Sequence, residues 1–348
     1  MSTTSRPEYP LDRPDVLIAA LPAVLGFVPE RSLVLVTAAH GQLGAVLRID
    51  LPGEDLEELR RLAETAGCAR PDIAIAVIVD ADGASCRLCA EEYRDMTRLL
   101  ADELLAHGME LIAAHVVDVV GAGGRWYCAD GCGNSGRVED PMASPMTLAA
   151  VLDGRRLYAR RADLLEVIAP VEPDRAAALA RLLDHAENVD PAGADAQARG
   201  GIEHALRCAA LVEAGAALDD EDLVRLGLAL TDPQVRDTLY ALAVGDRASQ
   251  AESLWVDLAR RLPAPWRAEA LALLAFSAYV RCDGPLAGIA LDAAQRCDPG
   301  HRMATMLDRA LQSGIRPEEI RELARTGYRL AARLGVPLPP RRLFGRTG

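Results

Sequence analysis

The chain contains no lysine, so all 38 of its basic residues are arginines. A Walker-type phosphate-binding loop depends on its lysine, and Schiff-base and pyridoxal-phosphate catalysis depend on a side-chain amine. These chemistries are therefore excluded for the chain acting alone. Aromatic residues are also scarce, at 4% of the chain. Because alanine and leucine are abundant in their place, the composition favours helix.

The sequence also lacks segments that would direct it into a membrane. No uncharged apolar run reaches the roughly 18–20 residues of a membrane span. The polar N-terminus, with Arg6, Glu8 and Asp12, carries no signal-peptide core. The net charge of −13 argues against a nucleic-acid partner, because counterion release needs a basic surface. We therefore expect a cytoplasmic protein that binds neither membranes nor nucleic acid, with its eight cysteines mainly reduced.

Several catalytic motifs are missing as well. The six histidines form no HExxH pair, and no G-x-S-x-G nucleophile turn occurs. Gly121, Gly123 and Gly124 follow an expected strand, but Trp126 stands where a dinucleotide-binding loop has its third glycine. We interpret these glycines as a hairpin turn.

The N-terminal half is organised around its densest apolar stretch, which opens with a helix. Apolar residues recur at helical spacing from Leu17 to Val28 and predict one buried helical face. Pro14 suits the first turn of this helix, and Gly26 suits its end. Pro22 removes one backbone hydrogen bond, so we expect a kink there.

The following segments predict an α/β domain. They are strands at 33–37 and 45–51 joined by a turn at 40–42, a helix opened by residues 52–55 and ended by Gly67, a strand at 73–79, a helix at 91–107, and strands at 110–120 and 126–128. The continuous apolar run at 73–79 predicts a strand buried on both faces. The order β-β-α-β-α-β-β predicts a mixed sheet with right-handed crossovers.

Strand patterns disappear in the second half of the chain. We predict an α/β domain over 1–128, a Gly/Pro-rich linker loop over 129–145, an all-α helical-hairpin domain over 146–336 and a disordered tail over 337–348. A plain helical bundle and a repeat domain remain alternatives for the helical part.

One helix pair in that part has the spacing of a tetratricopeptide-like unit, over residues 268–299. Its large, small and terminating positions are Leu274, Ala275, Ala287, Ala294 and Pro299, with a turn at Asp283-Gly284. Small alanines allow two antiparallel helices to pack closely, and the proline ends the second helix.

Four stretches carry a resemblance to a known family. They are residues 25–29, 48–52, 124–128 and 272–299. In them the sequence resembles the actinobacterial domain-of-unknown-function family 4192, over most of the chain. The resemblance implies a recurring architecture, and it supplies no activity, cofactor or catalytic residue.

The first candidate site consists of carboxylates that follow predicted strands. If those strands are parallel, Asp50, Asp80 and Asp118 approach the carboxyl edge of the sheet, where ligands of open α/β sheets bind. With Arg48 nearby, they would suit a Mg²⁺-assisted hydrolase or phosphatase. The alternative is structural, because aspartate commonly caps strands and begins turns.

The second candidate site consists of two cysteine pairs. Cys86 and Cys89 precede a predicted helix, where a lowered thiol pKa would suit thiol–disulfide exchange. Together with Cys128 and Cys132 they would supply four sulfur ligands for a structural Zn²⁺ ion. Free, partly buried thiols are the alternative.

Three functions follow from these patterns. The leading hypothesis is a non-catalytic protein-interaction or regulatory protein, whose helical domain presents a groove to a protein partner of unknown identity. The alternatives are the metal-dependent hydrolase at the sheet edge and a small-ligand sensor with a cleft between the domains. The leading hypothesis requires no cofactor, whereas zinc or magnesium would accompany the two candidate sites.

Overall fold

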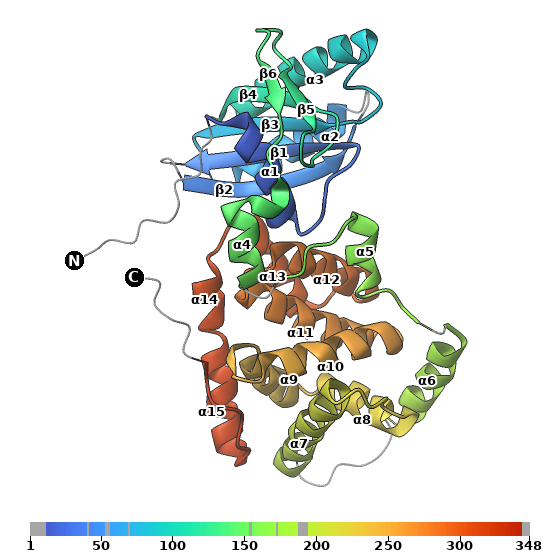
Figure 1. Cartoon of the computed structure of the whole chain (residues 1–348). Coiled ribbons are helices and arrows are strands. Elements are labelled where there is room, and N and C mark those ends of the chain that lie inside the picture. Colours follow the sequence, from blue (N-terminus) through green and yellow to red (C-terminus); the bar gives the residue numbers. More distant parts are fainter. Residues whose placement is uncertain are drawn as a thin grey trace, which may run out of the picture. The chain divides into compact units, whose positions relative to one another are not determined.

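The computed structural model describes residues 12–39, 42–52, 56–68, 70–152, 155–171, 173–186 and 194–342. Contacts divide the chain into two units, with the main division between Leu164 and Leu165, and they group Gln312–Gly314 with the first unit. We call the part up to Leu164 the sheet unit and the part that follows the helical unit (Figure 1). No helix among the described residues is long and apolar enough to cross a membrane.

The sheet unit contains a mixed sheet of six strands. The strands are β1 (Ser32–Ala39), β2 (Gln42–Asp50), β3 (Ile73–Val79), β4 (Glu110–Val117), β5 (Arg125–Cys128) and β6 (Ser135–Arg137), in the spatial order β2-β1-β3-β4-β5-β6. Only the pair β3 and β4 is parallel. The predicted α/β class and the first five strands are therefore confirmed. Strand β6 was not predicted, because its sequence Ser-Gly-Arg has no apolar alternation and it forms only by pairing with β5.

Three helices precede or connect these strands. They are α1 (Pro14–Leu25), α2 (Leu56–Gly67) and α3 (Arg87–Ala106). Helix α1 ends where predicted, because Gly26 takes the left-handed conformation with φ of 76° and its N–H donates to Pro22 O. Leu59 of α2 and Leu100 of α3 share one core with Ala76 of β3, so these two helices cover the same face of the sheet.

The sheet unit extends well past the predicted boundary at residue 128. Segments 129–145 and 146–152, predicted as a linker and as the start of the helical domain, contain β6, the 3-10 turn Pro141–Ala143 and α4 (Pro145–Leu152). Beyond them, Arg155 Nη1 donates to Ala23 O at 3.2 Å, and Tyr158 N donates to Gly26 O at 2.7 Å. Contacts across more than 130 positions leave no local sequence pattern, so the boundary could not be read from composition.

The helical unit is a bundle around one buried helix. Its helices are α6 (Pro173–Ala186), α7 (Ala194–Glu213), α8 (Asp220–Thr231), α9 (Pro233–Leu239), the 3-10 turn Tyr240–Val244, α10 (Ala248–Arg261), α11 (Arg267–Val280), α12 (Gly284–Cys297), α13 (Arg302–Gln312), α14 (Pro317–Arg321) and α15 (Ala324–Leu334), while α5 (Arg161–Glu166) spans the division. Residues 270–280 of α11 are buried without interruption. This helix is apolar on all sides and forms the centre of the unit.

The predicted pair of helices at 268–299 is present as α11 and α12. The turn lies at Asp283, whose side chain caps α12 by accepting the Leu286 N–H at 3.1 Å. Helix α12 ends at Cys297, two residues before the predicted terminating proline. The pair is therefore a helical hairpin within a bundle.

The first part of the predicted tail is packed on the helical unit. Tyr328 donates its hydroxyl to Pro339 O at 3.0 Å, and Arg342 N donates to Val244 O at 2.8 Å. Residues 343–348 of the tail lie outside the described residues, as do residues 1–11 at the polar N-terminus. The same holds for positions 40 and 41 of the predicted hairpin turn and positions 53–55 of the predicted helix start.

Candidate functional site

Asp50, Asp80 and Asp118 lie along one edge of the sheet. Strand β1 is antiparallel to both β2 and β3, so β2, β3 and β4 run in the same direction. Ser32 of β1 pairs with Asp50 on one side and with Val79 on the other. However, β1 separates β2 from β3, so the backbone of Asp50 lies two strand spacings, about 10 Å, from that of Asp80.

Each carboxylate at this edge is bound by groups close to it. Asp50 is exposed and pairs with Arg48 Nη2 at 2.6 Å. Asp80 accepts the Tyr93 hydroxyl at 2.5 Å and the Asp82 N–H at 3.1 Å. Burial raises the pKa of Asp80, but these hydrogen bonds outweigh it and leave the pKa below its usual value.

These three aspartates do not form a metal-binding cluster. Among the described residues, the groups whose ligand atoms lie close enough to share an ion include none of Asp50, Asp80 and Asp118. The three predicted aspartates therefore lie at the same edge of the sheet, but their carboxylates are too far apart to share an ion. Asp80 and Asp118 accept backbone N–H groups of the turns that follow their strands, which is the structural alternative that the sequence left open.

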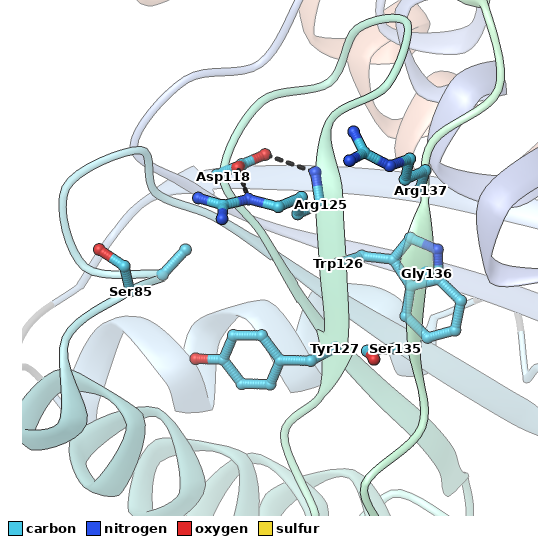
Figure 2. Close-up of a pocket in the computed structure, with 9 residues that line it drawn as sticks. Ser85, Asp118, Arg125, Trp126, Tyr127, Ser135, Gly136 and Arg137 are labelled. Atoms are coloured by element: carbon cyan, nitrogen blue, oxygen red, sulfur yellow. Dashed lines mark hydrogen bonds and ion pairs between the residues drawn. The ribbon is translucent and has the colours of Figure 1, made fainter.

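A pocket of about 430 Å³ opens beside Asp118 at the same edge. It is lined by Ala84 and Ser85 of the turn after β3, Asp118 after β4, Arg125, Trp126 and Tyr127 of β5, and Ser135, Gly136 and Arg137 of β6 (Figure 2). Crevices outside the carboxyl ends of strands are the usual ligand sites of open α/β sheets. The pocket is therefore the strongest candidate site of the sheet unit.

The one carboxylate in the pocket wall is already neutralised. Asp118 Oδ1 accepts the backbone N–H groups of Val119 and Arg125, each at 2.7 Å. Its Oδ2 accepts Arg125 Nε at 3.2 Å. Burial raises the pKa of Asp118, yet the hydrogen bonds from Arg125 and Val119 leave the pKa below its usual value. Asp118 therefore stays ionised and holds the Arg125 side chain in place.

The remaining polar atoms of the wall are mainly hydrogen-bond donors. Arg125 uses Nε for Asp118, and Arg137 uses Nη1 for Gly123 O at 3.2 Å. The Arg125 side chain is 72% exposed, so its terminal nitrogens face solvent. Two guanidinium groups and one neutralised carboxylate give the pocket an excess of positive charge.

Two buried donors in the wall have no hydrogen-bond partner among the described residues. They are Trp126 Nε1 and the Tyr127 hydroxyl. Figure 2 shows the Tyr127 ring extending toward the side of Ser85, while the Trp126 ring lies beside Gly136. Burial raises the pKa of Tyr127, so its hydroxyl stays protonated and can donate. Unpartnered buried donors are uncommon in folded proteins and call for an explanation such as a ligand.

The four predicted zinc ligands are not brought together. Cys89 packs with Tyr127 against the core on the α2 and α3 side. Cys128 follows Tyr127 in β5 and points to the opposite face, as neighbouring residues of a strand do. Among the described residues Cys128 and Cys132 instead form a group with Asp130, and Cys128 Sγ lies 3.6 Å from His115 Nδ1. The two pairs cannot share an ion in this arrangement.

The cysteine pair Cys86 and Cys89 has the local geometry that the redox hypothesis required. Cys86 is the N-terminal cap residue of α3. Hydrogen bonds from the backbone and side chain of Cys89 lower the pKa of Cys86, whereas the pKa of Cys89 is raised chiefly by its bond to Cys86. Cys86 and Cys89 are both free thiols. Cys86 is therefore the more reactive thiol of this pair.

Sequence reasoning missed the arginine and aromatic residues of the pocket. The stretch 124–128 attracted attention only through its family resemblance. A signal was present, because Arg125 and Arg137 flank two aromatic residues across a Gly-rich turn. It could not be interpreted without β6, whose pairing with β5 brings Arg137 opposite Arg125.

Comparisons with known proteins give one match. The model of the family described as "Domain of unknown function (DUF4192)" matches residues 14–318. Neither the curated proteins nor the solved structures contain a match to the chain.

Proposed function

Because the chain belongs to the DUF4192 family, whose description names no activity, we propose a function from the geometry: the sheet unit binds a small anionic ligand in the pocket between β5, β6 and the turn after β3. The single observation that carries the proposal is the buried Tyr127 hydroxyl, which has no partner among the described residues and lies on the same strand face as Arg125 and Arg137. The role is recognition of a ligand, and the chain acts as a small-ligand sensor.

The chemistry of the wall selects a phosphate or carboxylate group. Guanidinium groups bind such oxyanions through parallel charge-assisted hydrogen bonds. Arg125 and Arg137 are paired residues on neighbouring strands, so both can donate to one oxyanion. The buried Tyr127 hydroxyl supplies a neutral donor from the same strand as Arg125.

The size of the pocket also suits a small molecule. Its volume of about 430 Å³ lies in the range of roughly 300–1,000 Å³ that small-molecule sites occupy. The predicted sensor had its cleft between two domains, whereas this pocket is formed by the sheet unit alone.

Isothermal titration of the full chain with inorganic pyrophosphate and inorganic phosphate tests the proposal. We expect binding that weakens with added salt, as contacts to charged groups do. The variant Arg125→Ala/Arg137→Ala should lose at least about tenfold in affinity, since charge-assisted hydrogen bonds contribute about 1.5–3 kcal/mol each. Arg98→Ala is the matched control, because Arg98 is an exposed arginine of α3 paired with Asp95. Equal affinity in wild type and the double variant would contradict the proposal.

Protein interaction through the helical unit remains a second proposal. Its support is the tetratricopeptide-like spacing of α11 and α12, a pattern typical of helix pairs in interaction domains. Since α11 is buried along its length, a partner would contact the outer helices. Affinity capture with the isolated chain, repeated with an excess of pyrophosphate, tests whether a protein partner exists and whether ligand binding regulates it.

We further propose that the protein works in a reducing compartment, in agreement with the expected cytoplasmic location. The support is that Cys86, Cys89, Cys128 and Cys132 are free thiols, although they form two pairs that lie close together in sequence. The metal-dependent hydrolase is not favoured, because its aspartates are each engaged locally and do not cluster among the described residues.

A further inference from the structure

A second pocket lies wholly within the helical unit, apart from the proposed ligand site. It lies between α7 and α8, has a volume of about 510 Å³, and is lined by His204, Arg207, Cys208, Ala210, Leu211, Asp222 and Arg225. His204, Cys208 and Asp222 each offer one potential ligand atom, and these three atoms lie within 4.8 Å of one another. His204 and Cys208 lie one helical turn apart on α7, on the same face. Asp222 lies in the first turn of α8.

The distances among these atoms match those of ligands around a small metal ion. His204 Nε2 lies 3.4 Å from Asp222 Oδ1 and 3.6 Å from Cys208 Sγ, and Cys208 Sγ lies 3.9 Å from Asp222 Oδ1. Zinc bonds of about 2.0–2.3 Å at tetrahedral angles place ligand atoms roughly 3.3–3.6 Å apart. Two separations fit this range, and a small rotation of the Asp222 carboxylate brings the third into it.

The same contacts are poor hydrogen bonds. A nitrogen–oxygen distance of 3.4 Å exceeds the usual limit of about 3.2 Å. His204 and Cys208 are both buried apart from the side that lines the pocket. A metal ion between the three ligand atoms would satisfy all of them at once.

We propose that His204, Cys208 and Asp222 form a zinc site with an open fourth coordination position. A donor set of nitrogen, sulfur and oxygen suits zinc, whereas magnesium and calcium prefer oxygen alone. Three protein ligands with one open position are typical of zinc sites that bind a further molecule. The thiolate and the carboxylate balance the charge of Zn²⁺. Arg207 and Arg225 in the pocket wall then favour an anion in the fourth position.

The protein framework holds two of the ligands firmly. Both α7 ligands project from the buried side of a 20-residue helix. The third is fixed through its backbone, because Asp222 N donates to the capping side chain of Asp219 at 2.8 Å. Ligands placed on helices with restricted rotamers favour metal binding, since little ordering is needed.

Zinc binding at this site requires that Arg207 release its hydrogen bond to His204. Arg207 Nη2 donates to His204 Nδ1 at 3.1 Å, so the imidazole proton lies on Nε2 in this state. Zinc at Nε2 requires the proton on Nδ1, and Arg207 must then turn away into solvent, which its exposed position allows. Arg207→Gln offers an amide oxygen to the Nδ1 proton. We expect this variant to bind zinc about tenfold more tightly, the lower end of outer-shell effects on metal affinity.

Cobalt titration of the full-length chain tests the proposal, because a cobalt–thiolate bond produces a charge-transfer band. The Cys128→Ser background removes the other cysteine group of the described residues. In that background we expect about one equivalent of cobalt, displaced by zinc, with the band lost in Cys208→Ala and in Asp222→Asn. Cys297→Ala should keep the band, since Cys297 lies outside this pocket. Circular dichroism confirms that each variant is folded.

Two results would overturn the proposal. One is a band in the Cys128→Ser background that persists in Cys208→Ala. The other is binding below about half an equivalent in both the Cys128→Ser and the Cys128→Ser/Arg207→Gln chains. The loss of pyrophosphate affinity in Arg125→Ala/Arg137→Ala reports on the pocket of the sheet unit alone, so either proposal can fail without the other.

Discussion

Asp118 binds Arg125 twice, once through the backbone N–H at 2.7 Å and once through the side-chain Nε at 3.2 Å. This arrangement fixes the first residue of β5 to the end of β4. It also aims the terminal nitrogens of Arg125 away from the carboxylate. Asp118, predicted as a catalytic or metal-binding residue, is therefore better explained as a positioning residue for the pocket.

Asp118→Asn should lower the free energy of unfolding at pH 7. We expect a loss of about 1 kcal/mol, because hydrogen bonds to a charged group are stronger by roughly that amount than neutral ones. Urea unfolding measures it. Asp95→Asn is the control, since Asp95 makes only an exposed surface pair with Arg98 and should change stability by less than about 0.5 kcal/mol.

The effect of Asp118→Asn should depend on pH. Hydrogen bonds hold the folded-state pKa of Asp118 below its usual value, despite burial, which raises it. The ionised carboxylate therefore stabilises the fold above the unfolded pKa of about 3.9. This stabilisation is lost as the pH falls through the folded pKa. The difference between wild type and variant should shrink in urea unfolding below about pH 4, and a constant difference down to pH 2 would contradict the argument.

Tyr127→Phe should separate stability from ligand binding. Removing a buried hydroxyl without a partner should leave thermal stability unchanged or raise it by up to about 1 kcal/mol. Affinity for pyrophosphate should fall about threefold to tenfold, the contribution of one hydrogen bond. In the control Tyr93→Phe the hydroxyl lost is bonded to Asp80, so stability should fall by about 1.5–3 kcal/mol. A marked loss of stability in Tyr127→Phe would show that its hydroxyl has an internal partner.

Gly136→Ala should disturb the pocket through Trp126. A Cβ at position 136 would lie 2.9 Å from Trp126 Nε1, so the indole must move. We expect the free energy of unfolding to fall by about 1–3 kcal/mol, the usual cost of overpacking, as measured by thermal unfolding. Pyrophosphate binding should weaken at the same time. Gly200→Ala is the control, because a Cβ there meets no atom within 4 Å. In the interior of α7 it should stabilise the chain by about 0.5–1 kcal/mol.

Leu274→Ala should destabilise the helical unit strongly. Leu274 is fully buried in α11, and leucine-to-alanine changes in cores cost about 2–5 kcal/mol. Leu323→Ala is the matched control, since Leu323 is 39% exposed and surface changes usually stay within about 0.5 kcal/mol. Guanidinium unfolding followed by circular dichroism compares the two variants, and equal effects would mean that α11 is not the core of the unit.

Most of the strands and helices of the sheet unit could be predicted from the sequence, because the signals for them lie within each element. The apolar run 73–79 appears as β3 with the same bounds, and Gly26 ends α1 as predicted. Such signals depend on residues a few positions apart. They failed where partners are distant, as in β6, whose three residues have no strand pattern of their own.

The candidate sites show the same contrast between local features, which the sequence predicts, and contacts between distant residues, which it does not. The sequence correctly placed three aspartates at one sheet edge, because strand ends and polar residues are local features. It could not show that Tyr93 and Arg125 already bind Asp80 and Asp118. No local pattern joins His204, Cys208 and Asp222, since Asp222 lies 14 positions from Cys208.

By itself, the sequence determined the class of each half, the absence of lysine chemistry and the continuous apolar runs that bury β3 and α11. These properties follow from composition and from spacing within one element. Only the tertiary structure decided which side chains meet. The pairing of β5 with β6 joins Arg125 and Arg137, and the packing of α7 on α8 joins His204, Cys208 and Asp222. These contacts depend on burial and hydrogen bonding between segments that are distant in the sequence, so a local sequence pattern cannot predict them.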